Sequence, residues 1–147
     1  MRKQLVMWAF LKTVAPQISL SFCHNGSQYA MGRNHIEYDF DLTGVDVIYA
    51  HIKYVHKYTD INYVNPYLFI MLHEIGHHYT ENIKGDNLLR QMLSLAEPND
   101  VNEYVQIALQ YMNMPDEYAA TGWAIHFIKH HIPLIKKFNR LLRSCEQ

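Results

Sequence analysis

The sequence is poor in cysteine, glycine and proline, and it has no long apolar run. Its 147 residues include two cysteines, six glycines and five prolines. Cys23 and Cys145 form neither a CxxC pair nor a framework of four or six cysteines. We therefore expect two reduced thiols, with a single terminal disulfide as the alternative. No stretch approaches the roughly 20 apolar residues that a membrane span needs, so we expect no membrane segment.

The sequence also lacks an excess of charge of either sign. Thirteen basic residues face 14 acidic ones, and the formal net charge is -1. Because no block of like charge is present, no nucleic-acid partner is expected. Arg2 and Lys3 precede an apolar run at 5–11, but Lys12 ends that run and no clean cleavage site for a signal peptide follows. The sequence therefore predicts a cytoplasmic protein.

Apolar residues and histidines are plentiful. Hydrophobic residues make up 49% of the chain, with 11 tyrosines and six phenylalanines, which excludes a disordered protein. A chain of this length suits a single domain with its own core, and we expect that domain to span residues 1–147. Ten histidines are many for 147 residues, and histidine both titrates near neutral pH and binds metals.

The first part of the chain predicts one helix and a small sheet. Residues 3–14 favour a helix. Alternating apolar residues predict strands at 18–22, 28–31 and 35–40. Asn25-Gly26 is a strong hairpin signal between the first two strands, so we expect an antiparallel sheet. Residues 45–58 fit either a strand or a helix, and this alternative stays open.

The second half predicts helices. Asn65 is a suitable N-cap and Pro66 a suitable first residue for a helix that extends to about Glu81. Three more helices are predicted: one capped by Asp86, one capped by Asn99 or Asp100, and one from Pro115 to about His131, before Pro133 interrupts it. Strands followed by helices are typical of an α+β fold.

A His-Glu-Ile-Gly-His motif lies in the middle of the helix that begins at Pro66. His73 and His77 are four residues apart, which places them about 40° apart around the helix axis and about 6 Å apart along it. Both imidazoles can therefore bind one zinc ion, with bonds of about 2.0–2.1 Å. Glu74 is turned by about 100° from His73, so it suits a general base that takes a proton from water at the metal.

The helix that carries this motif also has an apolar face. That face contains Leu68, Met71, Leu72, Ile75 and Tyr79. A packed helix with two inward histidines and a glutamate needs a partner for these groups, because unpaired buried polar groups are costly. A metal would be such a partner, and a metal-free hydrogen-bond network is the alternative. Gly76 indicates a close approach by another segment, or it is simply tolerated at a cost of about 1 kcal/mol.

A catalytic zinc site normally has three protein ligands, and Glu117 is our candidate for the third. The metzincin pattern needs glycine at position 80 and histidine at position 83, but Thr80 and Ile83 stand there. Glu117 lies in the first turn of the helix from Pro115, and His126 lies about 180° around that helix from it.

Small residues on the face below Glu117 would let this helix pack closely against the motif helix. They are Ala120, Thr121 and Ala124. Three other acidic residues, Glu81, Glu97 and Glu103, lack such a face or lie in unsuitable places. The alternative role for Glu117 is a favourable interaction with the helix dipole. We expect His78, next to the motif, to lie at the surface or to support the site.

Together, the motif at 73–77 and the sequence Glu-x-x-Ala-x-x-Trp-Ala at 117–124 resemble the minimal gluzincin peptidases, in particular the ImmA/IrrE-like proteins of bacteria and their mobile elements. The resemblance covers the two motif helices and the order of strands and helices. It implies a zincin-like fold in which an edge strand beside the cleft pairs with a peptide, and we expect 35–40 to be that strand. Relatives often have an acid where this chain has Thr121, a weaker partner for a ligating histidine.

The sequence thus predicts a zinc-dependent metallopeptidase acting on a protein or peptide. His73, His77 and Glu117 would bind Zn²⁺, and Glu74 would be the general base. The alternatives are a weak or inactive zinc-binding regulatory or interaction protein of bacterial or mobile-element origin, and a structural domain without metal. Glu74 favours the enzyme, because a purely structural site needs the histidines but not the base. The substrate, the group that stabilises the oxyanion and the oligomeric state stay open.

Overall fold

The computed structural model describes residues 2–56 and 63–146, and for residues 51 and 53–56 it describes the backbone alone. Its elements are α1 (Lys3–Val14), β1 (Ser19–Phe22), β2 (Gln28–Ala30), β3 (His35–Tyr38), α2 (Val45–His56), α3 (Pro66–Tyr79), α4 (Asn87–Leu95), α5 (Val101–Met112), α6 (Pro115–His130) and α7 (Ile132–Ser144). The fold is α+β, as predicted, and it is mostly helical. Cys23 and Cys145 are both free.

Three of the described helices start at the predicted caps. The side chain of Asn65 accepts a hydrogen bond from the backbone N–H of Tyr67 at 2.9 Å at the start of α3. Asp86 and Asp100 cap α4 and α5 in the same way. These side chains satisfy N–H groups that the first turn of a helix leaves without a partner.

The structure decides the open alternative at 45–58 and adds one helix that begins next to Pro133. The open alternative at 45–58 is a helix over Val45–His56, while residues 57 and 58 lie outside the described part of the chain. Pro133 does separate two helices, but it lies in the first turn of α7, a helix that we did not predict. Proline is compatible with a first turn because no intrahelical partner exists there for its missing N–H.

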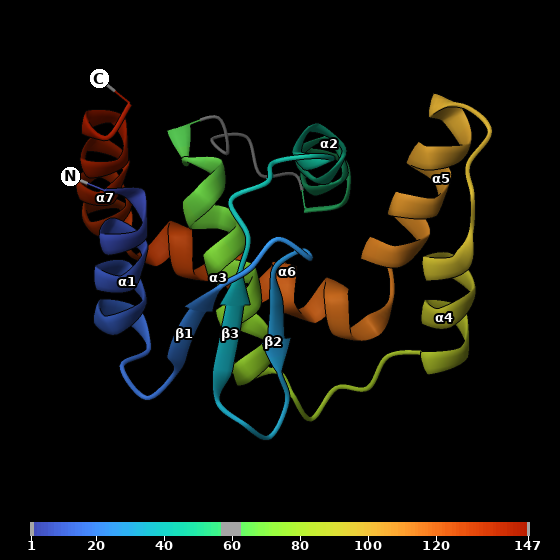
Figure 1. The fold of residues 1–147 in the computed structure, drawn as a ribbon, viewed down its shortest axis with the longest axis horizontal. Coiled ribbons are helices and arrows are strands. Elements are labelled where there is room, and N and C mark those ends of the chain that lie inside the picture. Colours follow the sequence, from blue (N-terminus) through green and yellow to red (C-terminus); the bar gives the residue numbers. More distant parts are fainter. Residues whose placement is uncertain (1, 57–62, 147) are drawn as a thin grey trace.

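The sheet is mixed, so the prediction of an antiparallel sheet was wrong. Its order is β1-β3-β2, with β1 parallel and β2 antiparallel to β3 (Figure 1). The chain does not form the expected hairpin at Gly26, because Gly26 donates its backbone N–H to the Asp39 carboxylate at 2.9 Å. Ser27 also accepts the N–H of Asp39 at 2.8 Å, so this segment crosses the end of β3 and β2 pairs on its far side.

The central position of β3 also makes our choice of edge strand wrong. β3 pairs with β1 along one edge and with β2 along the other, and its Ile36 and Tyr38 side chains are fully buried. The strand at 35–40 therefore has no free edge within the described sheet, and β2 is the edge strand that packs against α3.

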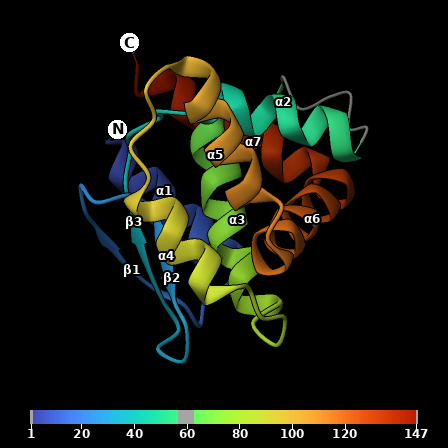
Figure 2. The ribbon, with the colours of Figure 1, turned by 90° about the vertical axis from the view of Figure 1, so that its right-hand side faces the viewer.

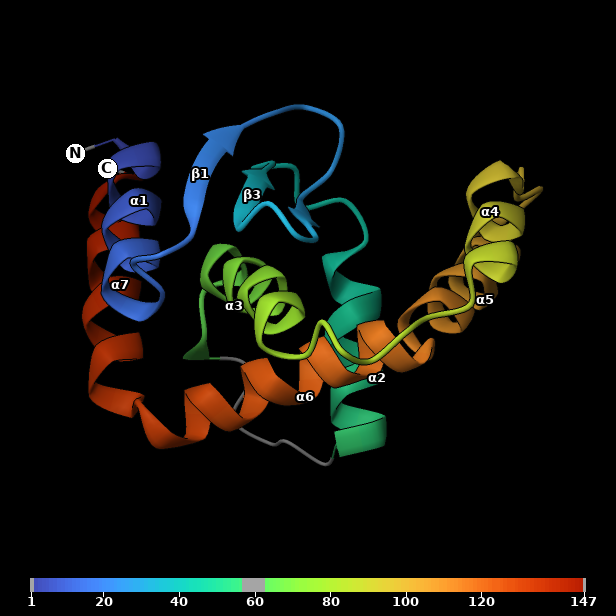
Figure 3. The same cartoon turned by 90° about the horizontal axis from the view of Figure 1, so that it is seen from below.

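The elements are arranged in layers around α3. The sheet lies on one side of α3 and α6 on the other (Figure 3), while α1 and α7 pack side by side at one end and α4 and α5 lie together at the opposite end (Figure 1, Figure 2). The buried core joins side chains from α1, β3, α3, α6 and α7, among them Phe10, Ile36, Leu68, Ile128 and Phe138. Within the described residues, no helix has the length and apolar character to cross a membrane.

Candidate metal centre

The site lies where α3 and α6 pack most closely. A Cβ at Gly76 would overlap with the carbonyl oxygen of Ala120 and lie 3.0 Å from its Cα, so only glycine permits this approach. The predicted inward face of α6 is buried as expected: Glu117, Ala120, Thr121 and Ala124. The close approach that Gly76 and this face indicated is confirmed, and the segment that approaches is the backbone of α6.

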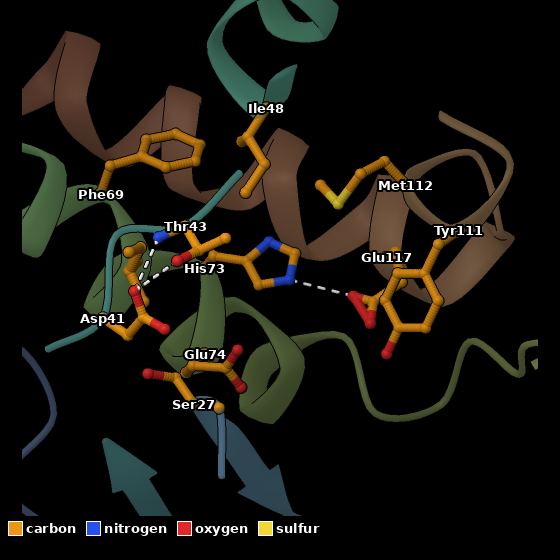
Figure 4. Close-up of a pocket in the computed structure, with 12 residues that line it drawn as sticks. Ser27, Asp41, Thr43, Ile48, Phe69, His73, Glu74, Tyr111, Met112 and Glu117 are labelled. Atoms are coloured by element: carbon orange, nitrogen blue, oxygen red, sulfur yellow. Dashed lines mark hydrogen bonds and ion pairs between the residues drawn. The ribbon is translucent and has the colours of Figure 1, made fainter. Parts of the chain in front are cut away.

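Three side chains meet across this contact. Oε2 of Glu117 lies 3.0 Å from Nε2 of His73 and 2.8 Å from Nε2 of His77 (Figure 4 shows the contact with His73). Nδ1 of His73 lies 3.1 Å from the hydroxyl of Thr121, which can accept the ring N–H there. One carboxylate oxygen thus faces two imidazole nitrogens. Either two ring N–H donors or a cation between the three atoms would satisfy this arrangement.

Glu117 and the two histidines affect one another's pKa values. Burial alone would raise the pKa of the Glu117 carboxyl, but hydrogen bonds and charge from His73 and His77 hold this pKa well below its usual range. Burial would likewise lower the pKa of His77, and the hydrogen bond and charge of Glu117 raise it instead. Glu117 is therefore held as an anion, and an anion that faces two imidazole nitrogens favours the binding of a cation.

Glu74 lies beside this group and is also buried, with 6% of its surface exposed. Burial is the main reason why the pKa of Glu74 is raised to about 7. His73 and His77 lower this pKa, and the charge of Glu117 raises it. A hydrogen bond from the backbone of Tyr29 has a smaller lowering effect. Among the described residues, His73, Glu74 and His77 offer ligand atoms within 4.8 Å of one another, so this group could hold a metal ion.

Arg90 on α4 belongs to the site, although we did not predict it. Its guanidinium donates to Oε1 of Glu117 at 3.3 Å and to the hydroxyl of Tyr111 at 2.6 Å, and it forms an ion pair with Asp116. Asp116 also accepts the backbone N–H of Glu117 at 3.0 Å. Arginine is common on exposed helices, so nothing in the sequence distinguished Arg90 from the other basic residues.

Two pockets open on either side of the site. The first has a volume of about 240 Å³ and an apolar wall formed by Ile48, Phe69, Ile70 and Met112 (Figure 4). The second has a volume of about 320 Å³ and lies between β2 and α4, with Gln28, Tyr29, Asn87 and Arg90 in its wall. Ser27, Glu74, Tyr111 and Glu117 line both pockets. The two pockets therefore adjoin at these four residues, and we call them together the cleft.

The structure keeps the other candidate ligands away from this group. Glu81, Glu97, Glu103 and His126 are all exposed. Glu103 accepts the backbone N–H of Asn99 at 2.8 Å near the start of α5 instead. Nδ1 of His78 lies 2.7 Å from the hydroxyl of Tyr29, so His78 connects α3 to β2.

Comparisons of this chain with protein-family models, curated proteins and solved structures find no match. The evidence for a function therefore comes from the arrangement of the site itself.

Proposed function

We propose that this protein is a zinc-dependent metallopeptidase of the gluzincin type. The observation that carries the proposal is the convergence of His73, His77 and Glu117 at 2.8–3.0 Å, with Glu74 buried beside them in an open cleft. The resemblance of the two motifs to the ImmA/IrrE-like peptidases points to the same chemistry. A metal-free network would need the histidines and Glu117, but it gives no reason for a second buried carboxylate, Glu74, beside them.

The donor set fits zinc. Two imidazole nitrogens and one carboxylate oxygen are the ligand types of a catalytic zinc site that keeps a position for water. Zinc bonds of about 2.0–2.2 Å at tetrahedral angles put neighbouring ligand atoms about 3.3 Å apart. The distances from Oε2 of Glu117 to the two Nε2 atoms, 3.0 and 2.8 Å, are slightly shorter than that spacing, so these residues would be suited to hold the ion.

Each residue has a part in the proposed reaction. Zinc, when bound, would polarise the scissile carbonyl and lower the pKa of water to about 7. Glu74 takes the proton of the attacking water on its carboxylate and delivers it to the nitrogen of the leaving amine. The hydroxyl of Thr121 contacts Nδ1 of His73 and fixes the orientation of the ring, so that Nε2 points toward Glu117.

A peptide is the substrate that the cleft suits best. The edge strand β2 borders one end of the cleft, and an extended peptide can pair with a free strand edge through its backbone. The other end has the apolar wall of Ile48, Phe69 and Met112, which suits an apolar side chain of the substrate. We therefore propose that β2, in place of the strand at 35–40, receives the peptide.

Metal analysis combined with a peptide-library digest tests this proposal. The purified protein should hold one equivalent of zinc, and the double variant His73→Ala/His77→Ala should hold none. The zinc-loaded protein should cut members of the library, and a chelator should stop the cleavage. Full zinc retention by the double variant would defeat the metal site. Tight zinc binding without any cleavage would favour the zinc-binding regulatory protein instead.

A further inference from the structure

Arg90 makes several polar contacts with residues of the site, although the helix that carries it is hardly packed against the rest of the protein. α4 has no buried residue, and it exposes Leu88, Met92 and Leu95 to solvent. Arg90 is half-buried and extends from this exposed helix to Tyr111, Asp116 and Glu117. The arginine thus contacts the carboxylate that faces both histidines.

We propose that Arg90 is a positioning residue that fixes the Glu117 carboxylate for metal binding. This inference rests on the proposed zinc site. The two oxygens of Glu117 have separate partners: Oε1 accepts from Arg90 at 3.3 Å, and Oε2 faces both imidazoles. A carboxylate held at one oxygen offers mainly the other, so Glu117 would hold a metal through Oε2 and would leave room for water there.

The charge of Arg90 would oppose this role if it stood alone, because a guanidinium repels a divalent cation nearby. Asp116 removes this difficulty. It forms an ion pair with Arg90, so the pair has no net charge, and the guanidinium orients Glu117 without adding a positive field. Asp116 itself is fixed, since it accepts the backbone N–H of Glu117 at 3.0 Å.

Two further contacts keep the guanidinium in place. The guanidinium carbon lies 5.0 Å from the centroid of the Tyr111 ring, within the range of a cation–π interaction. The loop before α4 packs directly on Asp116, because a Cβ at Gly85 would lie 2.7 Å from Cγ of Asp116. Arg90 therefore has one defined position relative to α6, which a residue that orients a ligand needs.

A purely structural Arg90 would only fasten α4 to α6, and zinc affinity separates the two roles. Zinc affinity is measured by competition with a chromophoric chelator for the wild type, Arg90→Met and Arg90→Lys. Arg143→Met on α7 is the matched control, since Arg143 is exposed and outside the cleft. Loss of a residue that orients a metal ligand typically weakens binding by about 10–100-fold. We expect a loss in this range for Arg90→Met, a smaller loss for Arg90→Lys, and none for Arg143→Met.

The visible spectrum of the cobalt-substituted protein gives a second readout. It should change in Arg90→Met, because Glu117 can then bind through both oxygens, and it should be close to wild type in Arg90→Lys. Unchanged zinc affinity and an unchanged cobalt spectrum in Arg90→Met would overturn the positioning role while leaving the zinc site intact. If Arg90→Met does not fold, Arg90→Gln takes its place in both measurements, with the same expected and overturning results. A wild type that binds no zinc would defeat the site and this inference together.

Discussion

Two pairs of helices border the cleft, and they are packed differently. On one side α3 and α6 pack so closely that Gly76 meets the backbone of Ala120, and the residues that face each other are buried. On the other side α4 has no buried residue and α5 has only Met112 (Figure 2). The first pair holds the histidines and Glu117, while the second supplies Arg90 and Tyr111. The proposed ligands thus lie on two helices that share the buried core, and the accessory groups lie on helices with almost no buried side chain.

The largest expected effect comes from changing the same residue type in the two regions. Glu74→Gln keeps the size of the side chain but removes the proton acceptor, so cleavage of any peptide that the wild type cuts should fall by a factor of about 10²–10⁴. Glu97→Gln, at an exposed position before α5, should cut at the wild-type rate. The measurement is the cleavage rate at equal zinc loading, with a chelator as the blank.

Zinc content decides how this first result is interpreted. Glu74→Gln should still hold a full equivalent of zinc, because Glu74 is not one of the three proposed ligands. Equal rates for Glu74→Gln and wild type would rule out the proposed mechanism. Loss of zinc from Glu74→Gln would instead make Glu74 a ligand.

Leucine truncation compares the packing of the two regions directly. Leu68 on α3 is fully buried, so Leu68→Ala should lower the free energy of unfolding by about 2–5 kcal/mol. Leu95 on α4 is 81% exposed, so Leu95→Ala should change it by no more than about 0.5 kcal/mol. Urea unfolding followed by circular dichroism measures both. Similar losses for the two variants would mean that α4 is covered by a partner in solution.

The smallest expected effect concerns the two glycines of the packed helices. Gly76→Ala places a methyl group against the backbone of Ala120, and such overpacking costs about 1–3 kcal/mol. Gly122→Ala is the matched control on α6: its Cβ would meet nothing within 4 Å, so the change should stabilise the protein by about 0.5–1 kcal/mol. Opposite signs in thermal unfolding would support the close approach, and a stabilising Gly76→Ala would contradict it.

Local signals predicted five of the seven described helices and the group of residues around the site. The caps at Asn65, Asp86 and Asp100 act through hydrogen bonds to residues two or three positions away, so the sequence alone contains both partners. The four-residue spacing of His73 and His77 is likewise a property of one helix. The small residues below Glu117 were informative because a close helix contact excludes larger ones.

The strand order and Arg90 depend on contacts between distant residues, which no local pattern specifies. Asn25-Gly26 favours a turn, but which strand pairs with β2 depends on Asp39, which accepts the N–H of Gly26. Arg90 meets Glu117 27 positions later, across two helices and a loop. α7 was missed for another reason: Pro133 was taken as an interruption alone, although proline also suits a first turn.

The hydrogen bond from the backbone of Tyr29 to Glu74 bears on which substitutions the protein can accept during evolution. The donor is a main-chain amide, which every amino acid except proline provides. Substitutions at this position therefore alter the link to His78 but leave the contact with Glu74 untouched. Homologous proteins could therefore differ at position 29 and keep the backbone hydrogen bond to Glu74, which a comparison of side chains would not detect.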